Sequence, residues 1–153
     1  MLFQLNLPMH PQRLKLEDGK DHIFCHVRRK FLSLTPEEWV RQNLISYLNT
    51  DLGYPLSLMK IERQVKGGKR IKRADVIVCD TNGQALMLVE CKAPTEKLNK
   101  DTFFQLGRYN RDVQATLLLI SNGMQHFCCS VSKDNEFNFL DEIPAYESIR
   151  SVH

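Results

Sequence analysis

Short segments rich in hydrophobic residues recur along the chain, some alternating with polar residues at the two-residue period of β-strands and some continuously apolar. This pattern predicts strands at 3–7, 14–16, 22–27, 56–65, 116–120, 124–131 and 136–140, the last as an edge strand. Glu17-Asp18-Gly19-Lys20 predicts a hairpin turn between the second and third runs, and Asn122-Gly123 predicts a turn before the sixth. Residues 28–30 are expected to form a solvated turn, and residues 148–153 a frayed tail.

Two segments have the three- and four-residue spacing of helices. Thr35-Pro36-Glu37-Glu38 predicts a helix start, because Thr35 can cap, Pro36 suits the first helical position and Glu38 stands where a capping box needs an acid. That helix should end before Gly53 and bury Trp39, Val40, Leu44, Tyr47 and Leu48. A second helix is predicted over 97–114, with Phe103, Phe104 and Leu106 on its buried side and Leu98, Thr102, Gln105 and Tyr109 along another face.

The segment 73–92, RADVIVCDTNGQALMLVECK, is predicted to form the central hairpin. Asn82-Gly83 between two apolar runs indicates a two-residue turn with both residues at positive φ. Pairing outward from that turn sets Asp75 opposite Glu90, with their side chains on one side of the hairpin. Lys92 follows Glu90 by one strand period and therefore shares that side.

The two opposed acids are the candidate chemistry of this hairpin. Its other residues are mainly apolar, as in strands covered on both faces, so two facing carboxylates repel unless one is protonated or a cation lies between them. Carboxylate oxygens are ligands that suit Mg²⁺ or Mn²⁺. The simpler alternative is that Lys92 only neutralises a structural pair of carboxylates.

Asp75 followed, after a gap, by Glu90-Cys91-Lys92 resembles the signature of the PD-(D/E)XK nuclease superfamily. Ala74 stands where the superfamily nominally has proline, but the acid is the metal ligand. Over 24–131 the chain resembles the N-terminal nuclease domain of type I restriction enzyme restriction (R) subunits, in particular a compact stand-alone bacterial branch. The motifs that carry this resemblance are LTPEEWVRQ, KRADVIV, VECKAP, QLGRYN and LLISNG.

The resemblance implies an α/β fold with a restriction-endonuclease-like core: a mixed central β-sheet flanked by helices, in the order αβββαβ, with an N-terminal β-hairpin extension. We expect one domain over 1–153, with the β extension at 1–33, the nuclease core at 34–131 and a C-terminal edge and tail at 132–153. It also implies a Mg²⁺-dependent endonuclease, with Mn²⁺ as an alternative ion, that hydrolyses DNA phosphodiester bonds. The implied catalytic residues are Asp75, Glu90, Lys92 and Gln105, and the implied metal ligands are Asp75, Glu90, the Cys91 carbonyl and Glu38.

Glu38 has a second interpretation, as a capping-box residue without a catalytic role, and Glu37 is the less favoured substitute. Gln105 and Tyr109 likewise have a simpler interpretation as part of a helix surface with a half-buried tyrosine.

A net charge of +3 is too small to indicate nucleic-acid binding by itself, but the cations are clustered. A basic loop beside a carboxylate pair is suited to hold a phosphodiester backbone, although a solvated hairpin tip is the simpler alternative. The predicted DNA-binding residues are Lys66, Lys69, Arg70, Lys72, Arg73 and Tyr109.

Composition sets the cellular context. The five cysteines contain no CxxC pair and fall mainly in apolar runs, which indicates a reducing compartment. We expect neither a membrane span, which needs ~18 apolar residues, nor an export signal, and therefore a cytoplasmic protein. Adjacent Cys25 and His26 would point to opposite faces of a strand, which does not favour zinc.

Two further functions stay open: a catalytically silent nucleic-acid-binding module, and an accessory subunit of a restriction-modification or helicase complex. The accessory role is credible because the chain has no GxxxxGK[ST] motor motif. DNA and other restriction-modification subunits are therefore the expected partners. A homodimer is also left open.

Overall fold

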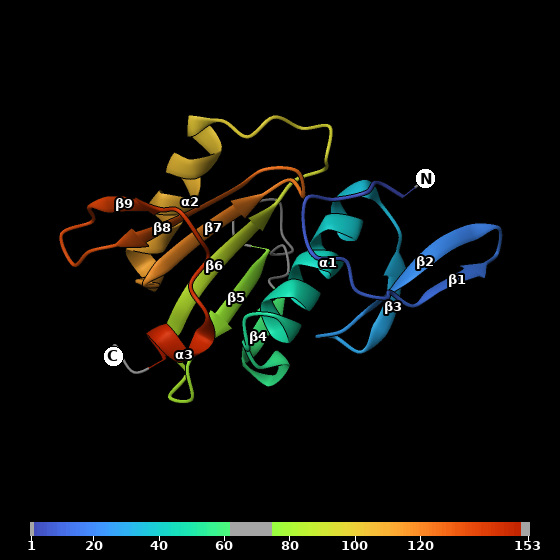
Figure 1. Cartoon of the computed structure of the whole chain (residues 1–153), viewed down its shortest axis with the longest axis horizontal. Coiled ribbons are helices and arrows are strands. Elements are labelled where there is room, and N and C mark those ends of the chain that lie inside the picture. Colours follow the sequence, from blue (N-terminus) through green and yellow to red (C-terminus); the bar gives the residue numbers. More distant parts are fainter. Residues whose placement is uncertain (1, 62–74, 151–153) are drawn as a thin grey trace, which may run out of the picture.

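A mixed six-stranded sheet forms the centre of the computed structural model, which describes residues 2–61 and 75–150 (Figure 1). Its strand order is β4-β5-β6-β7-β8-β9, and β6 and β7 are parallel while all other neighbours are antiparallel. The strands are β4 (Met59–Ile61), β5 (Val76–Cys79), β6 (Ala85–Cys91), β7 (Leu117–Ser121), β8 (His126–Val131) and β9 (Phe137–Leu140).

A separate three-stranded antiparallel sheet precedes the first helix and lies on its far side from the large sheet (Figure 1). It contains β1 (Leu14–Glu17), β2 (Lys20–Cys25) and β3 (Lys30–Ser33). The first two strands and their turn were predicted: Asp18 and Gly19 have φ values of 53° and 75°. The turn after β2 was also expected, but β3 was not.

The helices cover the two faces of the large sheet. They are α1 (Pro36–Thr50), the short 3-10 helix η1 (Leu56–Leu58), α2 (Lys100–Val113) and the single-turn α3 (Tyr146–Ile149). The result is an α/β fold consistent with a restriction-endonuclease-like core. None of the helices in the described parts of the chain is long and apolar enough to cross a membrane.

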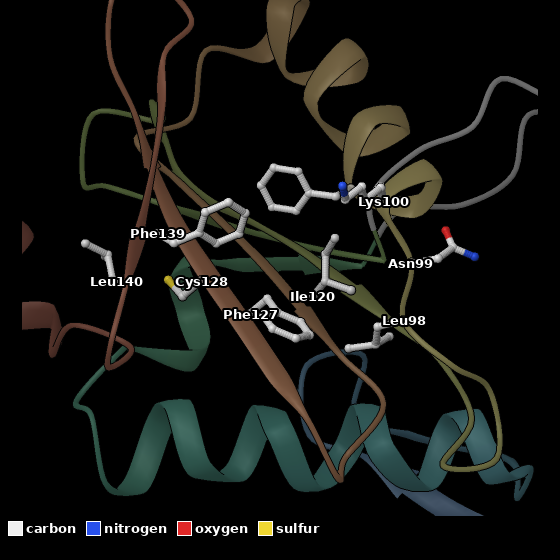
Figure 2. A pocket seen from close by; sticks show the side chains of 9 residues that line it. Leu98, Asn99, Lys100, Ile120, Phe127, Cys128, Phe139 and Leu140 are labelled. Carbon is white, nitrogen blue, oxygen red and sulfur yellow. The ribbon is translucent and has the colours of Figure 1, made fainter.

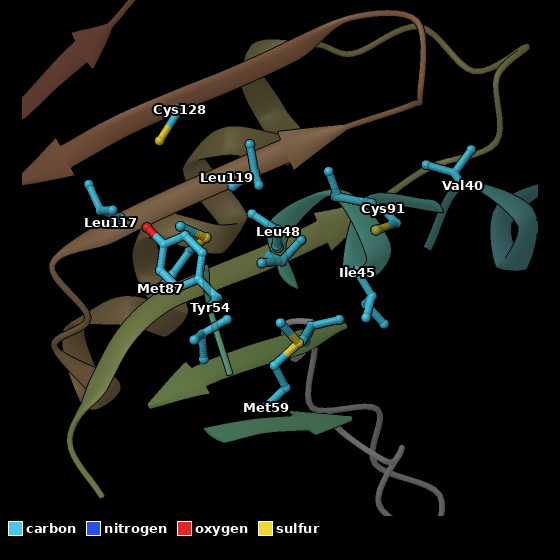
Figure 3. Packing of buried hydrophobic residues seen from close by; sticks show 14 of the residues in the cluster. Val40, Ile45, Leu48, Tyr54, Met59, Met87, Cys91, Leu117, Leu119 and Cys128 are labelled. Atoms are coloured by element: carbon cyan, nitrogen blue, oxygen red, sulfur yellow. The ribbon is translucent and has the colours of Figure 1, made fainter. Parts of the chain in front are cut away.

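Two hydrophobic clusters lie on opposite sides of the sheet. Residues at alternate positions of β6, such as Val89 and Cys91, pack toward α1, whereas Leu88 packs toward α2. Figure 3 shows Val40 and Leu48 of α1 among the side chains that fill the first cluster. Since both faces of β6 are covered, its C-terminal end has a fixed position between the two helices.

The start of α1 agrees with its prediction. Thr35 is the N-cap, and its hydroxyl accepts a hydrogen bond from the Glu38 N–H at 3.0 Å. Most of the predicted stripe is buried, although Tyr47 is only half-buried and Ile45 is buried in addition.

The turn between β5 and β6 differs from the prediction. It spans three residues, because the Asp80 N–H donates to the Gln84 carbonyl at 2.7 Å, and of the two predicted turn residues only Gly83 has positive φ (83°). The Asp80 carboxylate accepts from the N–H groups of Asn82 and Gln84 and so stabilises this longer turn. A bulge next to Cys79 then restores the predicted register, which pairs Val76 with Val89.

Two predictions at the ends of the chain differ from the structure of the described residues. Residues 3–7 do not form a strand, because their backbone bonds a loop and a side chain: the Asn6 N–H donates to the Gly123 carbonyl and the Trp39 indole to the Phe3 carbonyl. The tail is not frayed through residue 150, because α3 inserts Ile149 into the core.

Two further predictions need correction. The strand predicted over 56–65 begins as η1 and becomes β4 only at Met59, and 62–65 lie outside the described residues. Phe104 is 51% exposed, because the buried side of α2 follows Phe103 through Leu106, Gly107 and Asn110, and Phe104 points away from that side.

Gly123 tests how tightly the N-terminal segment packs against the sheet. At Gly123 φ is +85°, and an added Cβ would lie 2.7 Å from Leu5 Cδ2 and 3.1 Å from Val40 Cγ2. Gly123→Ala should therefore destabilise the protein by about 2–4 kcal/mol in urea unfolding, because overpacking of about 1–3 kcal/mol adds to the ~1 kcal/mol cost of a side chain at this φ. Gly83→Ala is the matched control, since its φ is +83° in open space, and should cost only about 1 kcal/mol. Equal losses would show that Leu5 and Val40 can move aside.

Candidate active site

Asp75 lies at the point where the ladder between β5 and β6 ends. Its N–H donates to the Val89 carbonyl at 2.8 Å, and its carboxylate Oδ2 accepts from the Cys91 N–H at 2.6 Å. These two bonds reach the residues on either side of Glu90, so Asp75 lies alongside Glu90 on the neighbouring strand.

Arg41 of α1 connects Asp75 to the helix. Its Nη2 donates to Asp75 Oδ1 at 3.2 Å, and its Nη1 donates to the Glu38 carboxylate. Glu37 also pairs with Arg41, at 3.6 Å. Arg41 was not among the predicted site residues, although its position three residues after Glu38 and four after Glu37 is the spacing of helical ion pairs.

The Glu38 carboxylate is held on both of its oxygens. Oε1 accepts from Arg41, and Oε2 accepts from Gln42 Nε2 at 2.8 Å. The buried Gln42 in turn accepts the His26 N–H at 3.2 Å. Glu38 therefore directs its side chain toward the Asp75 cluster, and only the Thr35 half of the predicted capping box is formed.

Glu37 lies at the rim of the same cluster. Its side chain is 45% exposed, and burial together with the nearby Asp75 carboxylate raises the pKa of Glu37. Glu38, at 11% exposure, is the more enclosed of the two glutamates.

Glu90 and Lys92 form the second half of the site. Lys92 Nζ lies 3.6 Å from Glu90 Oε2, as expected for two residues on one side of a strand, and 4.0 Å from Glu96 Oε2. By the alternation of β6, Glu90 points to the same side as Leu88, which α2 covers, whereas the Asp75 carboxylate is drawn to Arg41 of α1. The two acids thus approach the end of β6 from different directions, each beside its own cation. This differs from the prediction that both side chains lie on one side of the hairpin, because Arg41 draws the Asp75 carboxylate toward α1.

Cys91 separates these two halves. Its side chain is buried, and burial, reinforced by the Asp75 carboxylate, raises the pKa of the thiol well above its usual value. The thiol is therefore neutral. The Cys91 N–H is bonded to Asp75. The main-chain carbonyl is the oxygen with which Cys91 could bind a metal.

Of the other predicted site residues, two lie on α2 and the rest precede Asp75 in the chain. Gln105 and Tyr109 are half-buried on α2, the helix that covers the side of β6 to which Glu90 points. Their catalytic and DNA-binding roles remain predictions. The basic residues Lys66, Lys69, Arg70, Lys72 and Arg73 lie outside the described residues.

The donor chemistry fits a hard divalent cation, since Asp75, Glu90 and Glu38 offer carboxylate oxygens. Within residues 2–61 and 75–150, however, no three acidic, histidine or cysteine side chains converge closely enough to hold an ion. Arg41 and Lys92 lie against these carboxylates, so two cationic side chains offset part of the negative charge of the three acids in this arrangement.

A separate apolar groove of about 480 Å³ lies between α2 and the β8–β9 end of the sheet. Figure 2 shows Ile120, Phe127 and Phe139 directed into it. Lys100 is the one charged residue among the described residues that line the groove. Because no carboxylate lines it, this groove does not have the chemistry of the candidate site.

A family model described as type I restriction enzyme R protein N terminus (HSDR_N) matches residues 36–144, well over half of the chain. The chain therefore belongs to the family of type I restriction enzyme R protein N-terminal domains, as the motifs predicted. This membership supports a role in a restriction system. No curated protein matches the chain.

His126 supports the strand end that carries Lys92. The Lys92 N–H donates to the Ser121 carbonyl at 2.9 Å, and the Ser121 hydroxyl lies 2.7 Å from His126 Nδ1. His126 Nε2 lies 2.8 Å from the Asn6 carbonyl, which can only accept, so Nε2 carries the proton and the neutral ring accepts at Nδ1. Burial lowers the pKa of His126.

This depressed pKa makes stability depend on pH. Below its usual pKa of about 6.5 the histidine is protonated mainly in the unfolded chain, so its contribution is complete above that pH and is lost as pH falls toward the folded-state value. Urea unfolding at pH 8 and pH 5.5 should therefore show a larger loss of stability for the wild type than for His126→Gln. Equal losses would contradict this role for His126.

Proposed function

We propose that this domain is a metal-dependent endonuclease of a restriction system that hydrolyses phosphodiester bonds of DNA. The observations that support the proposal are the Asp75 carboxylate bonded to the N–H of Cys91, the residue after Glu90, the Lys92 ammonium 3.6 Å from Glu90, and Arg41 linking Glu38 to Asp75. The chain's family supports it, because the R protein belongs to restriction enzymes.

In this proposal Asp75, Glu90 and the Cys91 carbonyl would hold Mg²⁺ or Mn²⁺, with Glu38 as a further carboxylate. When bound, such an ion polarises the scissile phosphate and lowers the pKa of an attacking water. The Lys92 ammonium would orient that water and offset charge on the phosphoryl oxygens, and would have to lose its own proton first to act as the base. Gln105 positions Lys92 or the DNA backbone. The expected products carry a 5′-phosphate and a 3′-hydroxyl.

The environment of Lys92 suits this task. Its side chain is 23% exposed, so its ammonium can reach solvent and a substrate, while its backbone is fixed to β7 through Ser121. Its neighbour Glu90 is 8% exposed, which holds the partner acid in place. The proposal places the domain in the cytoplasm, together with DNA and the other subunits of a restriction-modification complex.

Three substitutions test the chemistry. Asp75→Asn, Glu90→Gln and Lys92→Met should each lower Mg²⁺- or Mn²⁺-dependent nicking of plasmid DNA by about 100-fold or more. Glu147→Gln on α3, with a side chain 76% exposed, is the control and should retain activity. Circular dichroism and thermal unfolding check that each variant is folded. Wild-type nicking by the Glu90 variant would overturn the assignment.

DNA binding is tested separately with the basic segment. Lys69→Ala combined with Arg70→Ala should weaken binding of a fluorescent duplex to a similar degree for different sequences and reduce the salt slope of log K by about 1 per lost phosphate contact. Lys133→Ala, between β8 and β9, is the control. Anisotropy titrations at several salt concentrations measure both. Salt-sensitive binding without cleavage by the wild type would instead indicate the silent binding module.

A further inference from the structure

We propose that Arg41 is a positioning residue that holds the carboxylates of Glu38 and Asp75 in the metal-free protein and competes with a divalent cation for the same two acids. The inference rests on the proposed function, because it concerns the metal site of that function. It adds a residue that the nuclease signature does not contain.

The Asp75 and Glu38 carboxylates have the same pattern of hydrogen-bond partners. Asp75 has Oδ2 on the Cys91 N–H and Oδ1 on Arg41. Glu38 has Oε2 on the Gln42 amide and Oε1 on Arg41. Each acid thus keeps one oxygen on a neutral donor that belongs to the fold, and its other oxygen on one shared guanidinium. A cation bound between these two acids would therefore compete for the two oxygens that Arg41 holds.

The charges make this arrangement responsive to a metal. Arg41 has a side chain only 14% exposed, and Glu38 and Asp75 are 11% and 21% exposed, so the group is shielded from water. One guanidinium against these two carboxylates leaves a negative charge, which still attracts a divalent ion. Without Arg41, two partly buried acids would face each other without this cation, which destabilises the metal-free fold and strengthens the attraction for the ion.

A purely structural ion pair would behave differently. Its loss would lower the melting temperature by the same amount with and without metal. Competition instead predicts that metal restores much of what the Arg41 substitution removes, so the metal-induced rise in melting temperature becomes larger than in the wild type.

The experiment compares the wild type with Arg41→Gln, Arg41→Lys and Arg150→Gln. Arg150 pairs with Glu147 at 3.1 Å on α3 and serves as the matched control. Thermal unfolding is measured in EDTA and in increasing MnCl₂, and Mn²⁺ binding is measured by calorimetry. Glu90→Gln is included to show that Mn²⁺ binds at the proposed site.

We expect Arg41→Gln to melt below the wild type in EDTA, to gain more from Mn²⁺, and to bind Mn²⁺ more tightly by a factor on the order of ten, as removal of one charge a few ångströms from the ion implies. Arg41→Lys keeps the positive charge but lacks the planar guanidinium that reaches both acids. Its melting temperature in EDTA and its affinity for Mn²⁺ should therefore lie between those of the wild type and Arg41→Gln. If Arg41→Gln does not fold, Arg41→Lys alone must still gain more from Mn²⁺ than the wild type.

The contrary outcomes are distinguishable. If Mn²⁺ stabilises the wild type through Glu90 but stabilises the Arg41 variants by no more than the wild type, the inference on Arg41 is wrong and the proposed function stands. If Mn²⁺ has no effect on the wild type or on any variant, the metal site itself is wrong and both proposals fall.

Discussion

The candidate site depends on the hydrogen bond between the Cys91 N–H and the Asp75 carboxylate, which takes the place that a backbone carbonyl would have in a longer strand. At the end of β6 the Cys91 N–H points toward β5, whose ladder has already stopped, and the Asp75 side chain accepts that N–H at 2.6 Å. A buried N–H without an acceptor is costly, so this bond fixes the Asp75 carboxylate to the sheet. Because β6 is covered on both faces, Asp75 takes its position from the rigid centre of the fold.

The helix α1 holds the remaining acid of the site, Glu38, and connects it to Asp75 through Arg41. Its first turns carry Glu38 and Arg41, and Gln42 links Glu38 to the turn after β2 through the His26 N–H. The site is therefore assembled from parts distant in sequence, each fixed by a hydrogen bond to a different element. The family match covers α1 and all strands of the large sheet, and so includes these described contacts except the one to His26.

The sequence predicted what depends on local pattern. The Thr35 cap, the course of α1, the register that pairs Val76 with Val89, and the edge position of β9 all follow from periodicity and turn chemistry. The turn between β5 and β6 was predicted wrongly because the Asp80 side chain stabilises a longer loop. Residues 3–7 alternate like a strand but bond a loop and an indole instead, and the sequence does not reveal such partners.

At the candidate site, too, contacts set by local sequence pattern could be predicted and contacts set by tertiary packing could not. Lys92 beside Glu90 follows from strand period alone. Arg41 could not be assigned to Asp75, because their contact depends on how α1 crosses the sheet, and periodicity within α1 indicates only its pairing with Glu37 and Glu38.

The N-cap of α1 therefore has a consequence beyond helix stability. First turns of helices fray more readily than their centres, and Glu38 belongs to the first turn that Thr35 caps. Unwinding of that turn would remove Glu38 from Arg41 while the sheet and Asp75 stayed intact. The position of the Glu38 carboxylate thus depends in part on the Thr35 hydroxyl, which acts only through the main-chain N–H of Glu38.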